Sequence, residues 1–239
     1  MTEVLFNHFF VTPDLEGFEA AERFLEGFGA LEKRTTVRRD MTYTGLYLYG
    51  DDTYLELLHP ASSSFGAPSG IAYGVETPGA IDAFQKAMQS ATVEEISRGD
   101  VPWFRLCRPE QLTGLAEWAM EYRPEFFRGF HPELPPARPG IARSDALTRY
   151  AASCGKLAER ERGLFGDVTG LDVALGSRDL ERWKARPLQV AGADLRVALG
   201  RPGIRTARLR LRRDAGRAVH RFGNTTLSLD GKSAVWRFD

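Results

Sequence analysis

The first half of the sequence contains one order of secondary-structure signals twice, at a period of about sixty-five residues. In the first copy, an apolar and aromatic run predicts a strand, and apolar residues at helical spacing then predict a helix. Three stretches with strand-like alternation or β-branched content follow. The five ranges are Val4–Val11, Asp14–Gly27, Leu31–Arg38, Tyr43–Tyr49 and Thr53–His59. This strand–helix–three-strand unit limits the fold more than any other feature of the chain.

The second copy begins about sixty-five residues after the first. Its ranges are Gly70–Glu76, Pro78–Ser90, Val93–Ser97, Val101–Leu106 and Leu115–Tyr122. The last of these, LAEWAMEY, fits a strand or a helix. Both copies together predict an α+β architecture for residues 1–123.

The remaining chain predicts a connecting region and a third, looser unit. Residues 124–139 are rich in proline and aromatic residues, which predicts a long loop or lid, and Arg143–Leu157 predicts a helix. Residues 124–166 therefore form the connection, and 167–239 a C-terminal α+β module. The strands and helix expected there are Val168–Leu175, Ser177–Ala185, Leu188–Val190, Asp194–Leu199, Arg205–Arg213, Thr225–Leu229 and Ala234–Phe238.

The charge balance argues against a nucleic-acid or membrane partner. Lys and Arg total 32 and so do Asp and Glu, so no global field attracts polyanions. In RTARLRLRR (205–213) the arginines alternate with apolar residues, which is typical of a strand with one solvated face. No signal peptide and no apolar run of about eighteen residues is evident, which favours a cytoplasmic protein. Cys107 and Cys154 lie far apart and are interpreted as reduced structural residues.

Two stretches of the repeat resemble a known superfamily. FNHFFVTPDLEGFEAAERFL is similar to the opening strand and helix of the vicinal-oxygen-chelate proteins (glyoxalases, bleomycin-resistance proteins and extradiol dioxygenases), with a histidine on the strand. TYTGLYLYGDDTYLELLHP resembles the third and fourth strands, with a glutamate in the fourth. The resemblance covers about residues 1–122. It implies paired βαβββ modules that form a curled mixed sheet. The order of elements in the C-terminal unit predicts a third, degenerate module, about which the resemblance says little.

The resemblance also implies a divalent metal (Zn, Fe, Mn, Ni or Co) held by the first and last strands of each module. His8 and Glu56 match the first module's ligand positions, and Glu121 matches the last-strand position of the second. The second module's opening strand departs from the pattern, because it offers Ala72, Tyr73 and Gly74 where a histidine is common. Superfamily members often complete their sites with residues from a second subunit, which implies a homodimer. The alternative is that the C-terminal unit completes the site within one chain.

The residues themselves leave alternatives to metal binding. Strict alternation places His8 on one face with Phe6 and Phe10, where an imidazole is costly unless its nitrogens are satisfied. Glu56 also lies in an apolar strand, so the pair fits a metal, an ion pair or a structural hydrogen bond. Glu121 fits a ligand or, with Glu117, a solvated helix face.

Other side chains are candidates for catalysis and for substrate binding. His131 in the proline-rich segment and Tyr47 could move a proton, although a surface loop histidine is the favoured interpretation of His131. Substrate contacts are expected from side chains near the proposed site that carry guanidinium, hydroxyl or aromatic groups. These residues are Arg34, Thr36, Arg38, Tyr43, Tyr73 and Trp103. An exposed strand face explains the first four equally well.

Two functions follow from these observations. The first is a metal-dependent enzyme of the vicinal-oxygen-chelate type that acts on a small organic molecule as a lyase, isomerase, epimerase or dioxygenase. The alternative is a metal-free protein that binds a small molecule or antibiotic in an aromatic cup of Phe6, Phe10, Tyr47, Tyr73 and Trp103.

Overall fold

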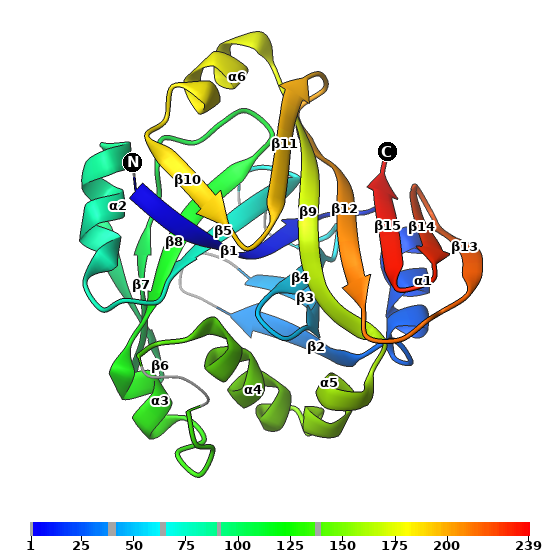
Figure 1. Cartoon of the computed structure of the whole chain (residues 1–239), viewed down its shortest axis with the longest axis horizontal. Helices are drawn as coiled ribbons and strands as arrows, with labels where there is room; N and C mark the ends of the chain where they lie inside the picture. The colour runs from blue at the N-terminus through cyan, green and yellow to red at the C-terminus, as the bar shows by residue number, and fades with distance from the viewer. Residues whose placement is uncertain (1, 38–41, 63–65, 90–91, 137–139) are drawn as a thin grey trace.

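The computed structural model describes residues 2–37, 42–62, 66–89, 92–136 and 140–239. Within these ranges the strands form a nine-stranded curled mixed sheet and a six-stranded sheet (Figure 1). None of the helices in the described ranges is long and apolar enough to cross a membrane. The fold is α+β, as the sequence predicts.

The first module has the predicted order of elements. They are β1 (Thr2–Val11), α1 (Leu15–Leu25), β2 (Ala30–Val37), β3 (Thr42–Tyr49) and β4 (Tyr54–Leu58). The helix begins where the Asp14 carboxylate accepts a hydrogen bond of 2.7 Å from the Gly17 amide, which satisfies one of the amides that a helix start leaves free. Phe18, Ala21 and Leu25 form its buried face.

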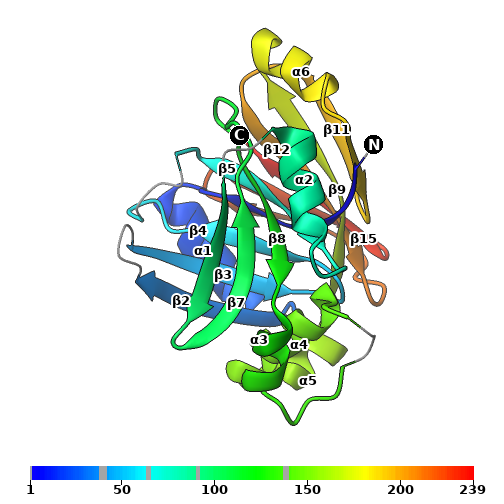
Figure 2. The same cartoon turned by 90° about the vertical axis from the view of Figure 1, so that its left-hand side faces the viewer.

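The second module repeats this order, and LAEWAMEY is a strand. The elements are β5 (Ser69–Val75), α2 (Ala80–Met88), β6 (Val93–Arg98), β7 (Val101–Cys107) and β8 (Ala116–Tyr122). The sheet order β2-β3-β4-β1-β5-β8-β7-β6 places the opening strands of both modules side by side in its centre. Figure 2 shows the sheet curling so that the strands of the second module stand across those of the first.

Three short helices follow where the sequence predicts a loop and one helix. They are α3 (Pro124–Gly129), α4 (Arg143–Ser153) and α5 (Leu157–Arg162). Proline is tolerated in the first turn of a helix, so Pro124 begins α3 rather than preventing it. The predicted helix 143–157 divides at Gly155, whose φ of +71° lies outside the helical region. The three helices lie in a row at one end of the curled sheet (Figures 1 and 2).

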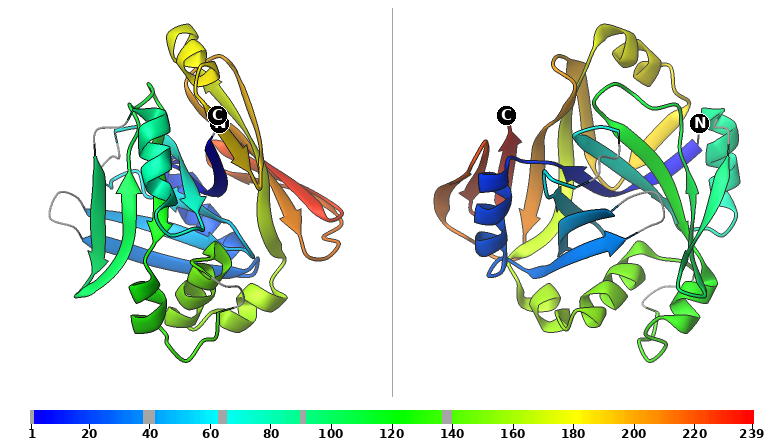
Figure 3. Two further views of the ribbon diagram at one scale, coloured as in Figure 1. Left: turned by 60° about the vertical axis from the view of Figure 1, so that its left-hand side comes forward. Right: turned by 180° about the vertical axis from the view of Figure 1, so that it is seen from behind.

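The C-terminal unit supplies the second sheet and one strand of the first. Its elements are β9 (Phe165–Leu175), α6 (Ser177–Lys184), β10 (Leu188–Ala191), β11 (Asp194–Leu199), β12 (Gly203–Leu211), β13 (Arg217–Phe222), β14 (Thr225–Asp230) and β15 (Ser233–Phe238). Strand β10 pairs in parallel with β1, while the others form the order β11-β9-β12-β15-β14-β13. Figure 3 shows this sheet beside the first, and buried side chains such as Phe9 and Phe238 join both in one hydrophobic core.

One carboxylate of the C-terminal unit accepts three hydrogen bonds from the turn between β3 and β4. Oδ1 of Asp167 on β9 accepts hydrogen bonds of 2.9 Å from the Asp52 amide, the Thr53 amide and the Thr53 hydroxyl. Its other oxygen pairs with Arg210 at 2.6 Å. Hydrogen bonds to a charged acceptor are stronger than neutral ones, so this residue links the two sheets.

We expect Asp167→Ala to lower the free energy of unfolding by about 2 kcal/mol, because it leaves the turn amides without an acceptor. Urea unfolding followed by circular dichroism measures the change. Asp172→Ala is the matched control, since Asp172 is on the same strand but half exposed and paired only at the surface. Its expected cost is below about 1 kcal/mol. Equal costs for the two variants would contradict the linking role of Asp167.

Candidate functional site

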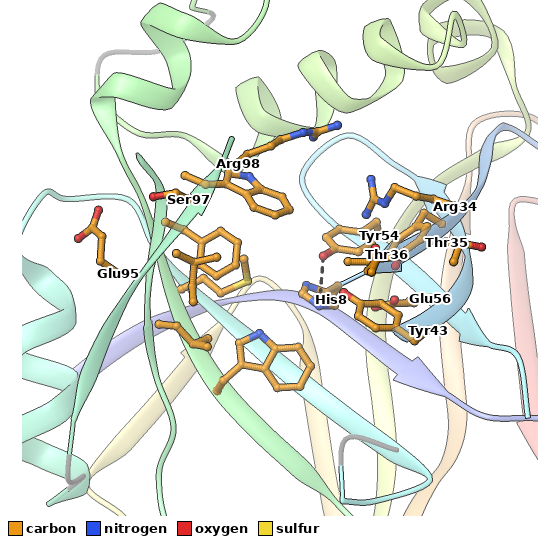
Figure 4. A pocket seen from close by; sticks show the side chains of 18 of the residues that line it. His8, Arg34, Thr35, Thr36, Tyr43, Tyr54, Glu56, Glu95, Ser97 and Arg98 are labelled. Atoms are coloured by element: carbon orange, nitrogen blue, oxygen red, sulfur yellow. Dashed lines mark hydrogen bonds between the residues drawn. The ribbon is translucent and has the colours of Figure 1, made fainter. Parts of the chain in front are cut away.

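The curled sheet encloses a cavity of about 650 Å³ with walls from both modules (Figure 4). A cavity of this size accommodates a small organic molecule. Residues of the first module that line it are His8, Arg34, Thr36, Tyr43, Tyr47, Tyr54 and Glu56. Residues of the second module include Ile96, Arg98, Trp103, Phe104, Trp118 and Met120.

His8 reaches the cavity because β1 contains a bulge. The pairing of β1 with β5 shifts register between Phe6 and His8, so Asn7 is the extra residue. The predicted alternation is therefore wrong at this point: Phe6 packs in the core beside Tyr73, while His8 faces the cavity. Phe10 is on the cavity side of the sheet, where it stacks on Trp118 with ring centroids 6.0 Å apart.

Both ring nitrogens of His8 have hydrogen-bond partners. Nδ1 lies 2.9 Å from Oδ1 of Asn7, and Nε2 lies 3.1 Å from the Tyr54 hydroxyl. An imidazole that donates from Nδ1 and accepts at Nε2 is neutral. Burial lowers the pKa of His8 to about 3, in agreement with that state. Tyr54 also stacks on the ring, with centroids 4.0 Å apart.

Glu56 is a buried carboxyl group at the same cavity. It is opposite Tyr47 across the β3–β4 pair and 5% exposed. Burial raises its pKa to about 7, and the nearby Tyr47 hydroxyl and Arg34 guanidinium only partly oppose that rise. The group therefore exists in both protonation states near neutral pH. Such a carboxyl can donate or accept a proton from a bound molecule.

Three arginines line the cavity, and Arg34 and Arg98 approach it from different modules. The Arg34 guanidinium lies 4.2 Å from the centre of the Tyr47 ring and forms an ion pair of 3.0 Å with Glu32. The Arg98 guanidinium lies 4.3 Å from the Phe130 ring and 5.5 Å from the Trp103 ring. Its Nη1 atom is buried and, within the described ranges, has no hydrogen-bond partner.

The structure brings together seven of the eleven residues predicted for the site. His8, Glu56, Tyr47 and four of the substrate-contact candidates line the cavity; these four are Arg34, Thr36, Tyr43 and Trp103. Arg38, a further candidate for substrate contact, lies outside the described residues.

The other three predicted residues do not line the cavity. The buried Glu121 carboxylate faces α2, where it accepts a 3.0 Å hydrogen bond from the Ile81 amide and lies 3.6 Å from Arg105. Tyr73 is on the same side of the sheet and donates a 2.7 Å hydrogen bond to Glu117. His131 packs edge-on against Phe130 and lies 2.8 Å from Glu133 at the surface. Of the three metal candidates, only His8 and Glu56 share the cavity.

Several lining residues were absent from the sequence-based selection. Trp118 and Met120 alternate with Glu117 and Glu121 on β8, so the choice of Glu121 as a ligand selected the face of this strand that is turned away from the cavity. The alternation of Ile96 and Arg98 on β6 carries a weaker signal of the same kind. Tyr54 precedes Glu56 by two residues on β4 and shares its face by the same rule.

The donor atoms at the cavity do not form a metal centre in this arrangement. The described residues contain no group of three or more His, Cys, Asp or Glu side chains that could hold a metal ion. The Nε2 lone pair of His8, which a metal would need, accepts the Tyr54 hydroxyl. Structural metal sites take four protein ligands and catalytic zinc sites take three, so His8 and Glu56 alone are too few.

A family model matches residues 6–201, which include both modules, the helical connection and part of the C-terminal unit. The chain belongs to DUF5829, a family of unknown function. The match covers the cavity-lining residues, so the cavity lies within the part of the chain that defines the family.

Comparison with solved structures finds partial likeness to methylmalonyl-CoA epimerases. One, in complex with methylmalonyl-CoA and NH4+, is 16% identical, covers 51% of this chain and 96% of its own, and has a TM-score of 0.32. A variant of the Streptomyces coelicolor enzyme, in complex with 2-nitronate-propionyl-CoA, is 16% identical, covers 50% and 94%, and has a TM-score of 0.31. Scores this low carry no argument about function. Among curated proteins, no significant match was found.

The raised pKa of Glu56 predicts how stability depends on pH. Between pH 4.5 and about 7 the unfolded chain ionises this carboxyl while the folded protein keeps its proton, so the free energy of unfolding falls as pH rises. Glu56→Gln removes this dependence. We therefore expect the variant to gain stability relative to the wild type by about 3 kcal/mol between about pH 4.5 and pH 8.

Urea unfolding at the two pH values measures this difference. Glu95→Gln, at the exposed rim of the same cavity, is the control and should follow the wild type. A stability difference between Glu56→Gln and the wild type that stays constant with pH would show that Glu56 is not a buried, protonated carboxyl.

Proposed function

We propose that this protein binds a small planar organic molecule in the cavity between its two modules. The observation that supports this most directly is the aromatic lining of both walls. Tyr43 and Tyr54 come from the first module, and Trp103, Phe104 and Trp118 from the second. Aromatic side chains bind flat ligands by stacking and edge contacts, and pockets of about 300–1,000 Å³ suit drug-sized molecules.

A few polar groups at the same cavity would orient the bound molecule. The neutral His8 ring, the Tyr47 hydroxyl and the Glu56 carboxyl lie among the aromatic side chains. Few polar groups in an apolar pocket give specificity, because a ligand that leaves them unpaired loses affinity. Glu56 also gives the site a group that could transfer a proton, so proton-transfer catalysis on the bound molecule is compatible with this proposal.

Binding of the neutral fluorescent probe N-phenyl-1-naphthylamine tests the proposal. We expect saturable binding by the wild type and about tenfold weaker binding by Trp118→Ala, because the variant loses ring contacts inside the cavity. Trp183→Ala is the matched control, since Trp183 lies on α6 outside this cavity, and its affinity should equal that of the wild type. No saturable binding, or equal loss in both variants, would contradict the proposal.

A metal-dependent enzyme of the vicinal-oxygen-chelate type is the second candidate. It is favoured by one observation: His8 and Glu56 lie on paired strands and line the same cavity. A metal there would have to displace the Tyr54 hydroxyl from His8 and recruit further ligands. The arrangement of donors therefore supports metal-free binding more strongly.

Elemental analysis separates the two candidates. After incubation with Zn²⁺, Mn²⁺, Fe²⁺, Co²⁺ or Ni²⁺ and dialysis, we expect the wild type to keep less than one equivalent of any metal, because two donors hold a divalent ion weakly. Retention of one equivalent by the wild type, lost in both His8→Ala and Glu56→Gln, would instead establish the metal-dependent candidate. Glu121→Gln, away from the cavity, is the control.

A further inference from the structure

Three arginines line the cavity, and two of them, Arg34 and Arg98, lie on the same side of it. The third, Arg108, is paired with Glu94 at 2.5 Å. In Figure 4 the guanidinium groups of Arg34 and Arg98 are on the side nearest the helices, whereas Glu56 and Tyr43 are farther from them. Arg34 is on β2, and Arg98 is the last residue of β6. This side is closed by the segment that carries Phe130 and by α4, whose Tyr150 accepts a 2.7 Å hydrogen bond from the Trp103 indole. Each module thus contributes one of these two arginines to this end of the cavity.

The charges of these two arginines are not equally compensated. Arg34 is paired with Glu32, which also accepts a hydrogen bond from the Tyr49 hydroxyl. Arg98 has no ion pair within the described ranges, and the nearest acids along its strand and in α3 are engaged by Arg123, at 3.2 Å from Glu95 and 3.6 Å from Glu125. The end of the cavity therefore carries one uncompensated positive charge.

Arg98 is also held in place without an acceptor. The rings of Phe130 and Trp103 flank its guanidinium, and its Nη1 atom is buried with no hydrogen-bond partner in the described part of the chain. A buried donor without a partner is costly, and such a group in a native structure calls for an acceptor, such as a water, an ion or a bound ligand. A planar guanidinium fork fits the two oxygens of a carboxylate or phosphate.

We propose that the molecule bound in the cavity carries an acidic group, a carboxylate or a phosphate, that Arg98 binds with Arg34 beside it. This inference rests on the proposed function and names the substrate class of the same site. The planar part of the ligand lies against Trp118 and Phe104, and its acid points toward the helices. The opposite orientation is unfavourable, because it places the acid beside Glu56, which would then have to keep its proton, since two like charges repel strongly in a buried site.

Three probes with one ring system test the proposal: 2-naphthoate, 2-naphthyl phosphate and the neutral 2-naphthamide. Titration calorimetry with the wild type should show at least one acidic probe binding about tenfold more tightly than the amide, because hydrogen bonds to a charged group are stronger. The acid that binds better identifies which of the two groups the site takes. In Arg98→Gln this preference should disappear, while the affinity for 2-naphthamide stays within about twofold of the wild type.

Arg221→Gln is the matched control, because Arg221 is exposed on β13 in the second sheet, and it should keep the full preference. Retention of the amide affinity shows that Arg98→Gln has folded. Equal wild-type affinities for all three probes, or a preference that survives in Arg98→Gln, would overturn the inference and leave the proposed function intact. Absence of binding by every probe, including N-phenyl-1-naphthylamine, would overturn both.

Discussion

The pairing of β1 with its neighbours is the constraint on which the rest of the structure depends. On one side β1 pairs with β5 and so joins the two modules into one sheet. On the other side its first residues, Thr2–Leu5, pair with β10, and its last residues, His8–Val11, pair with β4. The change of neighbour coincides with the bulge at Asn7. One extra residue at this point decides that His8 faces the cavity and Phe6 the core.

A buried arginine stabilises this irregular point. Arg143, at the start of α4, donates from Nη1 to the Phe6 carbonyl, and its Nε and backbone amide both bond to Glu76 at 3.0 and 2.9 Å. A bulge leaves backbone groups out of the ladder, and a buried carbonyl needs a donor. Helix α4 therefore helps to position His8, because its first residue, Arg143, fixes the backbone of β1 next to the bulge from which the His8 side chain projects.

Much of the fold could be predicted from the sequence, because burial imposes regular periodicity on β1 to β8 and on α1 and α2. The prediction of a face for Phe6 was wrong because one inserted residue reverses the alternation, and nothing in VLFNHFFV indicates where it occurs. His8, Glu56 and Tyr47 could be predicted for the site as polar groups in apolar strands. The position of Glu121 could not be predicted, since it depends on which face of β8 is covered by α2. Nor could the role of Arg98, because it depends on the Phe130 ring, which is distant in sequence.

Strand β10 has a consequence for the order in which the protein assembles. The first residues of the chain find their parallel partner at Leu188–Ala191, so Thr2 pairs with a residue made far later. During synthesis the start of β1 keeps an open edge until most of the chain has emerged from the ribosome. Exposed strand edges favour aggregation, and contacts this distant in sequence form slowly. The nascent protein is thus open to aggregation at this edge until Leu188–Ala191 has been made.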